Sequence, residues 1–333
     1  PKTDPTGTTG TTRIASATRT ARSAPDMGEW AHRWGARAKP SLAMNPLHHA
    51  LLEARIAVVA PYRRAHLDRQ SGQGAAPIFV PFYHRVADSN PNDWTISTEQ
   101  FRIHVEHCRA TFDLIDLAEL QRRIRARKSF RPAVSFTFDD GYAENSEFAL
   151  PLLIEHGVPC TYFVATSHVR GQHPFQHDAR AGVPLPVNTP GQLREASDAG
   201  IEIGLHTRNH VDFSMIDDPL EVRREIAEAK DELEQMIGCP VRYFAFPYGL
   251  PRQLTQPAIE AVGEAGLLGF CSAFGGYNLV GRDEFHIRRF HGDPQFARLR
   301  NWLSFDRRKV RREPDVPYTL STGGSFQVTA ATS

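Results

Sequence analysis

The sequence has 333 residues, and its 39 Lys and Arg against 38 Asp and Glu give a formal net charge of +1 with the 15 His neutral. That length suits one large domain or two ordinary ones, and a hydrophobic content of 41% is enough to bury a core. The balanced charge argues against a general nucleic-acid binder, which carries a broad basic excess. Apolar runs such as residues 78–83 fall far below the roughly 18 residues that span a bilayer, so no transmembrane segment is expected.

The first 45 residues predict a disordered N-terminal segment. Residues 1–24 are rich in Thr, Ser, Ala, Gly and Arg and have almost no large apolar side chains. Such a stretch cannot bury enough surface to offset its conformational entropy. No basic stretch followed by an apolar one marks a signal peptide, so the sequence leaves both the cell envelope and the cytoplasm open as locations.

Residues 46–75 predict a helical extension. Apolar residues recur at roughly helical spacing from Leu47 to Leu67, interrupted by Pro61. This periodicity favours an amphipathic helix that packs on the main domain. A helix that contacts a partner or a membrane surface is the alternative, but its scattered arginines make only a weak basic face.

Short apolar runs alternate with amphipathic stretches in residues 76–303, which predict the main domain. The expected strands are 78–84, 112–115, 133–138, 160–165, 201–205, 241–246, 268–273 and 285–288. The expected helices are 97–109, 117–127, 144–156, 190–199, 219–237 and 256–265. Ser97 and Gln100 form a capping box, and glycines just past four helices suit left-handed C-terminal residues. Strands alternating with helices imply a parallel sheet, and seven or eight such units predict a (β/α) barrel.

Residues 304–333 predict a basic, flexible C-terminal tail. A run of arginines and one lysine between residues 307 and 312 is followed by prolines and a stretch rich in Ser, Thr and Gly. A solvated terminus is the simplest interpretation. A contact with an anionic polymer is the alternative.

Two adjacent carboxylates, Asp139 and Asp140, end an apolar strand and precede a glycine turn at Gly141. Burying one unpaired carboxylate is costly, and burying two is more so. A divalent cation removes the conflict by binding one carboxylate and leaving the other as a base. A pair of acidic groups at a helix N-terminus is the structural alternative.

Two histidines, His206 and His210, follow another apolar strand, and their spacing of four is usual for an imidazole pair on zinc. No Glu follows His206, so the zinc-protease pattern is absent. In a parallel barrel the Asp pair and the His pair both lie at the carboxyl ends of strands, where active sites occur. One carboxylate and two imidazoles would form a catalytic metal site with an open position.

A third candidate feature is the segment 243–249, in which a strand stops at Pro247 and a turn leaves the backbone N–H of Tyr248 free. Such a donor suits an oxyanion formed in acyl-group hydrolysis. Pro-Tyr-Gly is also ordinary turn chemistry, so the feature alone is weak.

Taken in order, these motifs resemble those of the polysaccharide deacetylases, carbohydrate esterase family 4, with its NodB homology domain. They are Thr-Phe-Asp-Asp-Gly at 137–141, His-Thr-x-x-His at 206–210 and Phe-Pro-Tyr-Gly at 246–249. The resemblance covers roughly residues 77–303. It implies a distorted (β/α) barrel, a divalent metal ion, most commonly Zn, and hydrolysis of N- or O-acetyl groups on sugar polymers. The implied roles are general base for Asp139, metal ligands for Asp140, His206 and His210, and oxyanion donor for the Tyr248 N–H.

The sequence departs from that family in two places. Many relatives carry an arginine in the third motif that holds the base carboxylate, and this sequence has Ala245 there. Arg288 or Arg289, at the end of the last strand, could supply that charge instead. The general acid is left open between His291, in the region of the family's late motif, and His84, which ends the first strand.

The resemblance thus implies a metal-dependent hydrolase that deacetylates an acetylated carbohydrate polymer or oligosaccharide. The balanced charge predicts no nucleic-acid partner. A non-catalytic carbohydrate-binding or regulatory module on the same fold is one alternative, which the missing arginine favours. A metal amidohydrolase acting on a small molecule is another, because it would share every ligand. Two imidazoles and a carboxylate suit zinc, cobalt and nickel alike.

Overall fold

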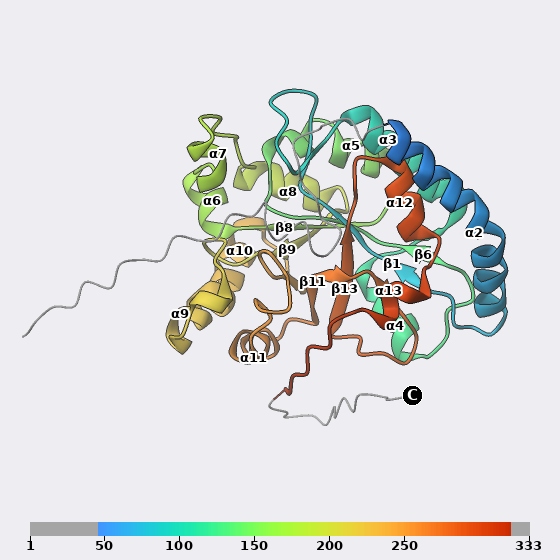
Figure 1. The fold of residues 1–333 in the computed structure, drawn as a ribbon. Helices are drawn as coiled ribbons and strands as arrows, with labels where there is room; N and C mark the ends of the chain where they lie inside the picture. The colour runs from blue at the N-terminus through green and yellow to red at the C-terminus, as the bar shows by residue number, and fades with distance from the viewer. Residues whose placement is uncertain (1–45, 321–333) are drawn as a thin grey trace, which may run out of the picture. The chain divides into compact units, whose positions relative to one another are not determined.

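The computed structural model describes residues 46–320, and the structural statements below concern these residues (Figure 1). Seven parallel strands close into a barrel in the order β10-β11-β13-β2-β7-β8-β9. They are β2 (Pro81–Tyr83), β7 (Phe136–Phe138), β8 (Cys160–Val164), β9 (Glu202–Leu205), β10 (Tyr243–Ala245), β11 (Gly269–Gly275) and β13 (His286–His291). The register between β11 and β13 shifts after Cys271, so the barrel is irregular. The predicted distorted (β/α) barrel is confirmed.

A four-stranded sheet beside the barrel has the order β12-β1-β6-β5. Its strands are β1 (Ile78–Phe79), β5 (Asp113–Leu114), β6 (Ala133–Val134) and β12 (Tyr277–Asn278). The sequence predicts single strands over 78–84 and 133–138, but each divides, at Val80 and at Ser135, between this sheet and the barrel. All strand residues on both sides of each division are buried, so an apolar run gives no sign of where the partner strand changes.

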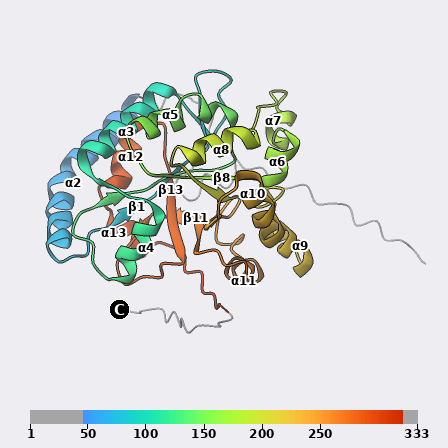
Figure 2. The same ribbon diagram turned by 180° about the vertical axis from the view of Figure 1, so that it is seen from behind.

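Helices cover the outside of the barrel (Figures 1 and 2). They are α3 (Thr98–Thr111), α4 (Leu117–Arg125), α5 (Ala149–Glu155), α6 (Thr166–Gly171), α7 (Gln176–Arg180), α8 (Pro190–Asp198), α9 (Pro219–Arg223), α10 (Ala229–Ile237), α11 (Gln256–Glu264) and α12 (Phe296–Leu303). The short turns η1 (Ala143–Ser146) and η2 (Phe213–Met215) and the strand pair β3 (Arg85–Val86) and β4 (Thr95–Ile96) complete this layer. The capping box at Ser97 forms as expected. Within residues 46–320 no helix combines the length and hydropathy of a bilayer crossing.

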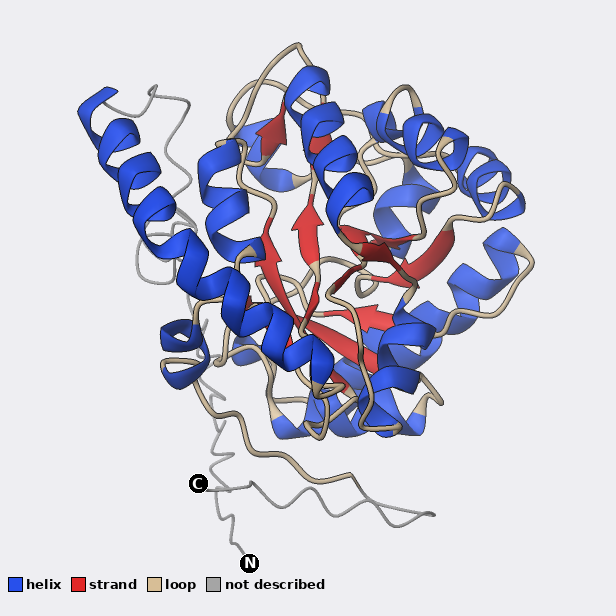
Figure 3. Cartoon of the chain, turned by 90° about the vertical axis from the view of Figure 1, so that its right-hand side faces the viewer, coloured by secondary structure: helices blue, strands red, loops and turns tan. Residues whose placement is uncertain are grey.

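The helix expected over 46–75 is α2 (Pro46–Gly72), a long helix on the outside of the fold (Figure 3) that packs beside α12 (Figure 1). Its buried Arg63 donates to Asp306 Oδ2 at 2.6 Å and to Asn301 Oδ1 at 2.8 Å. The ring of His66 stacks on Phe305 at 5.6 Å. Polar and aromatic contacts, with the buried Ile56 and the core-facing Leu67, hold this helix, while Leu47, Leu51, Val58 and Tyr62 are exposed.

Residues 304–320 do not form the flexible tail that the sequence predicts. The helix α13 (Arg307–Arg311) begins at Asp306, whose side chain accepts from the backbone N–H of Arg308 at 3.1 Å. Apolar side chains spaced among the charges pack against the core, namely Val310, Val316, Tyr318 and Leu320. The prediction was wrong here because it considered the charges of the run and not these side chains. Residues 321–333 and the predicted disordered segment 1–45 lie outside the described residues.

Buried histidines couple the stability of this fold to pH. The imidazole of His104 on α3 is fully buried, with its Nδ1 3.2 Å from the hydroxyl of Tyr83. Burial, followed by the nearby His107 and His291, lowers the pKa of His104 from 6.5 to about 3. The unfolded chain therefore binds a proton between these values that the folded chain does not, and acid favours unfolding there by up to about 1.4 kcal/mol per pH unit.

We expect the variant His104→Gln to lose this pH dependence. The difference in unfolding free energy between the native chain and the variant should shrink as the pH falls below 6.5, because only the native chain must protonate this buried group on unfolding. Urea unfolding monitored by circular dichroism over a pH series measures the difference. A difference in unfolding free energy that stays constant with pH would contradict the expectation.

Candidate active site

The residues of the three motifs meet at one end of the barrel. Asp139 and Asp140 follow β7, His206 follows β9, Tyr248 follows β10, and His291 ends β13. Because the barrel strands are parallel, their carboxyl ends share one rim. Segments more than 100 residues apart in the chain thereby contribute to a single site.

Asp140, His206 and His210 each place one donor atom within 4.8 Å of the others. Asp140 Oδ1 lies 3.4 Å from His206 Nε2 and 3.3 Å from His210 Nε2. This buried oxygen accepts no hydrogen bond from the described residues, and burial by itself would raise the pKa of Asp140. His206, His210 and His84 outweigh that effect and hold its pKa well below the usual value. An ionised oxygen without a donor and two imidazole nitrogens fit a divalent cation such as zinc.

The backbone is strained at four of these positions. Asp140, Thr207, His210 and Tyr248 have φ angles of 75°, 64°, 54° and 61°. These angles lie in the left-handed region, which costs residues other than glycine about 1–2 kcal/mol each. Such turns persist only where the surrounding contacts determine them, and they cluster at functional sites. Here they turn the chain sharply after a strand, so neighbouring side chains reach one pocket.

The ring of His206 is fixed by the third motif. Its Nδ1–H donates to the carbonyl oxygen of Ala245 at 2.8 Å, because a carbonyl can only accept. This bond leaves Nε2 as the nitrogen with a free lone pair, which is the usual arrangement of a histidine that binds a metal. Ala245, where many relatives carry arginine, therefore contributes its backbone to the site.

The carboxylate of Asp139 is held by Arg289. Two hydrogen bonds of 2.7 and 2.8 Å join the guanidinium to the two carboxylate oxygens, and both side chains are buried. The guanidinium also lies over the ring of Phe82, 4.9 Å from its centroid, and its Nε donates to Ser272 O at 2.9 Å. Burial alone would raise the pKa of Asp139, but Arg289, with His206 and His84, lowers it below the usual value.

The sequence does not decide whether Arg288 or Arg289 holds the base carboxylate, and in the structure the two arginines have different partners. Arg289 faces Asp139, while Arg288 pairs with Glu313. Successive side chains of a strand point to opposite faces, so only one of the two can face the barrel interior. The sequence places both residues on the last strand but does not say which face each occupies.

Both candidates for the general acid lie beside Trp94. The ring of Trp94 is 4.5 Å from that of His84 and 5.6 Å from that of His291, and the two imidazoles are 6.3 Å apart. Burial lowers the pKa of His84 to about 4 and also lowers that of His291. The geometry brings both imidazoles to the site.

Motif analysis did not find the residues that hold the walls of this site. Arg85 is fully buried and donates to Ser89 O, Asn90 O and Glu144 Oε1 at 2.8–2.9 Å, which fixes the loop that carries Trp94. Phe175, from the segment between α6 and α7, places its ring 5.3 Å from that of His210. No local pattern identifies these residues, since their partners lie in other segments.

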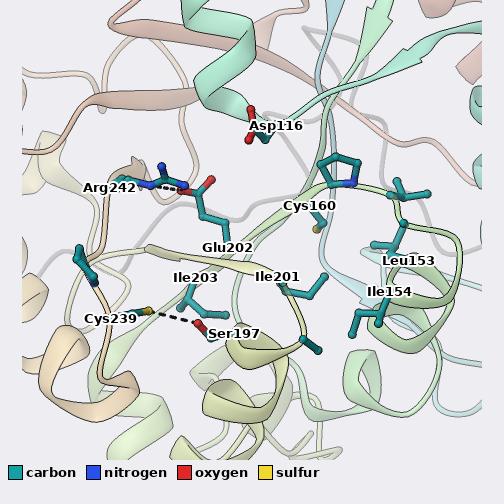
Figure 4. Close-up of a pocket in the computed structure, with 16 residues that line it drawn as sticks. Asp116, Leu153, Ile154, Cys160, Ser197, Ile201, Glu202, Ile203, Cys239 and Arg242 are labelled. Atoms are coloured by element: carbon teal, nitrogen blue, oxygen red, sulfur yellow. Dashed lines mark hydrogen bonds and ion pairs between the residues drawn. The ribbon is translucent and has the colours of Figure 1, made fainter.

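A separate hollow of about 660 Å³ lies at the opposite end of the barrel (Figure 4). It is lined by the first residues of β8 and β9, including Cys160 and Glu202, so it opens away from the site. Glu202 is already paired with Arg242 at 2.7 Å and with the hydroxyl of Thr161 at 2.9 Å. No residue of the three motifs lines this hollow.

Comparison with known proteins identifies the domain. Residues 126–267 match the family model for polysaccharide deacetylase. This part of the chain is therefore similar to polysaccharide deacetylases. The chain is 24% identical over 190 residues to the putative polysaccharide deacetylase YxkH of Bacillus subtilis, covering 56% of this chain and 62% of that protein. It is 27% identical over 162 residues to a chitooligosaccharide deacetylase of Sinorhizobium fredii, covering 40% and 65%. The matched part of the chain thus spans less than two thirds of the length of each of these relatives.

Solved structures of deacetylases share the fold. IcaB from Ammonifex degensii superposes with a TM-score of 0.58 at 22% identity, covering 69% of this chain and 97% of that one. A de-N-acetylase from Aggregatibacter actinomycetemcomitans gives 0.57 at 21% identity, covering 68% and 99%. The Streptococcus pyogenes deacetylase PplD gives 0.55 at 18% identity, covering 66% and 94%. At these identities the likeness concerns the barrel alone.

The buried pair of Asp139 and Arg289 should show strong coupling. Replacing Arg289 by Met leaves an uncompensated buried carboxylate, which costs about 3–5 kcal/mol. The double variant Asp139→Asn, Arg289→Met should recover much of that loss, as measured by urea unfolding of the metal-free chain. Arg288→Met, at the next position of the same strand, is the control and should show no coupling to Asp139→Asn. Additive effects of Asp139→Asn and Arg289→Met would contradict the assignment of the pair.

Proposed function

We propose that this chain is a metal-dependent hydrolase that removes N-acetyl groups from an acetylated amino-sugar polymer or oligosaccharide. The observation that carries the proposal is the buried carboxylate of Asp139, held by Arg289, next to Asp140, His206 and His210. The match of residues 126–267 to the polysaccharide deacetylase model supports an acetylated carbohydrate as the substrate. Relatives named as chitooligosaccharide deacetylases support an amide rather than an ester.

In the proposed reaction each residue of the site has a separate role. A divalent cation held by Asp140, His206 and His210 would polarise the acetyl carbonyl and lower the pKa of a water molecule. Asp139, which Arg289 keeps ionised, removes a proton from the attacking water as general base. As the new C–O bond forms, the backbone N–H of Tyr248 donates to the developing oxyanion. The C–N bond then breaks as the proton taken from the water passes through an imidazole to the leaving nitrogen, which releases a free amine and acetate.

We propose His84 as the imidazole that protonates the leaving group. It follows β2, which pairs directly with β7, so it lies next to Asp139 on the rim. Its buried Nδ1 has no hydrogen-bond partner among the described residues, so no such bond commits this nitrogen to a structural role. His291 ends β13, which β2 separates from β7, and it packs edge to face against Trp94, so we assign it a role in positioning that ring.

Two observations bear on the alternatives. The absence of an arginine at position 245 favours a non-catalytic module, but Arg289 supplies that charge from another strand. A module that only binds has no need of a base beside a metal site. Trp94, half-buried beside both imidazoles, offers an indole face to a sugar ring and so favours a carbohydrate over a small amide.

Metal content and acetate release test the proposal together. The native chain should hold about one divalent cation and release acetate from oligomers of N-acetylglucosamine. Asp139→Asn should keep the metal but lose roughly 10²–10⁴-fold in kcat, while His206→Ala should lose both metal and activity. Undiminished acetate release by Asp139→Asn, or a native chain that binds no metal, would rule the mechanism out.

The two imidazoles can be separated by a matched pair of variants. His84→Gln should lose roughly 10²–10⁴-fold in kcat because the leaving nitrogen has no proton donor. His291→Gln should keep most of kcat and raise KM, since it acts only through Trp94. Steady-state kinetics on the same oligomer measures both variants, and a larger loss of kcat in His291→Gln would transfer the acid role to that residue.

A further inference from the structure

The loop between the two histidine ligands, residues 207–209, sets where His210 lies. His206 is oriented directly by its hydrogen bond to Ala245 O. Apart from Asp140 Oδ1, which lies 3.3 Å from its Nε2 and belongs to the site itself, the contacts of the His210 ring are aromatic, at 5.3 Å from Phe175 and 5.4 Å from Tyr248. Ring packing restrains a side chain less specifically than a hydrogen bond does, so the position of His210 Nε2 depends on the backbone that leads to it.

That backbone is strained and needs external support. Thr207 and His210 both have left-handed φ angles, and the buried hydroxyl of Thr207 has no partner among the described residues. The carbonyl groups of Thr207 and Arg208 accept from the first turn of α6, at 3.2 and 2.9 Å. The N–H groups of the loop require acceptors from elsewhere.

Glu225 supplies those acceptors. Its Oε2 accepts from the backbone N–H groups of Arg208 and Asn209 at 3.0 and 2.8 Å, and its Oε1 accepts from Asn209 Nδ2 at 2.5 Å. Its backbone carbonyl also accepts from Arg208 N at 3.2 Å. The Glu225 side chain is buried, at 3% exposure, and its bonds to the loop are partly buried; bonds to a carboxylate are stronger than neutral ones.

A local irregularity of the helix accompanies this contact. The sequence predicts one helix over 219–237, but Arg224–Glu228 forms a π turn between α9 and α10. A π turn inserts one extra residue and recurs at functional sites, and this one buries Glu225 and Ile226. The side chain of Arg208 adds a second tie to the same helix through Glu232 on α10, at 2.8 Å.

We propose that Glu225 is a positioning residue of the metal centre. By fixing the backbone at 208–209 it holds His210 Nε2 beside Asp140 and His206, and so sets the affinity of the site for a divalent cation. The residue contacts neither substrate nor metal. The inference rests on the metal centre of the proposed function and adds to it a residue that lies outside the three motifs.

Metal binding tests this role without any assay of activity. Titration with Zn²⁺ against a chromophoric chelator should show an affinity about 10–100-fold lower in Glu225→Ala, the usual effect of losing a group that orients a ligand. Glu225→Gln keeps an acceptor for the two backbone N–H groups and should recover part of the affinity. Glu228→Ala, an exposed position of the same π turn with the same charge change, should match the native chain.

A second control separates positioning from general destabilisation. Val222→Ala removes part of a buried side chain from α9 and should lower the melting temperature without changing the affinity for Zn²⁺. Native affinity in Glu225→Ala, or an equal loss in Val222→Ala, would overturn the inference. Zn²⁺ binding that depends on Glu225 in a chain that releases no acetate would support the inference and refute the deacetylase. A native chain that binds no Zn²⁺ would refute both.

Discussion

The site depends on the burial of two carboxylates that are adjacent in the chain. Asp139 and Asp140 are each 3% exposed, and neither charge is tolerable in the interior without a partner. In the structure each of the two carboxylates has a different partner. Arg289 neutralises the first through two hydrogen bonds, and the two imidazoles surround the free oxygen of the second. This division leaves one ionised group as a candidate base and the other as a candidate ligand.

The parallel barrel makes this division possible because it brings the ends of distant strands to one rim. Arg289 lies 150 residues after Asp139 in the chain, yet their strands are separated only by β2 in the barrel. The same rim carries the strained turns at Asp140, Thr207, His210 and Tyr248. Backbone strain of this kind has to be offset by surrounding contacts. Some of these contacts come from the outer helices, as the hydrogen bonds of Glu225 to the loop at 208–209 show.

For the carboxylate of Asp139, the position of the neutralising guanidinium matters more than the strand that carries it. The third motif has Ala245 where an arginine is usual among relatives, and its carbonyl orients His206 instead. The guanidinium reaches Asp139 from β13, between the rings of Phe82 and Phe163. The electrostatic environment of Asp139 is therefore complete although the motif is not.

The sequence by itself determined the alternation of strands and helices, the barrel, and the motif residues at strand ends, because periodicity, turn residues and short spacings are local properties. Only the tertiary structure decided that the runs 78–84 and 133–138 change partners midway, that Arg289 rather than Arg288 faces Asp139, and that a π turn holds the loop before His210. It also decided that residues 304–320 pack on the barrel. Each of these depends on a partner far away in the chain, and a buried group is specified by that partner rather than by its neighbours in sequence.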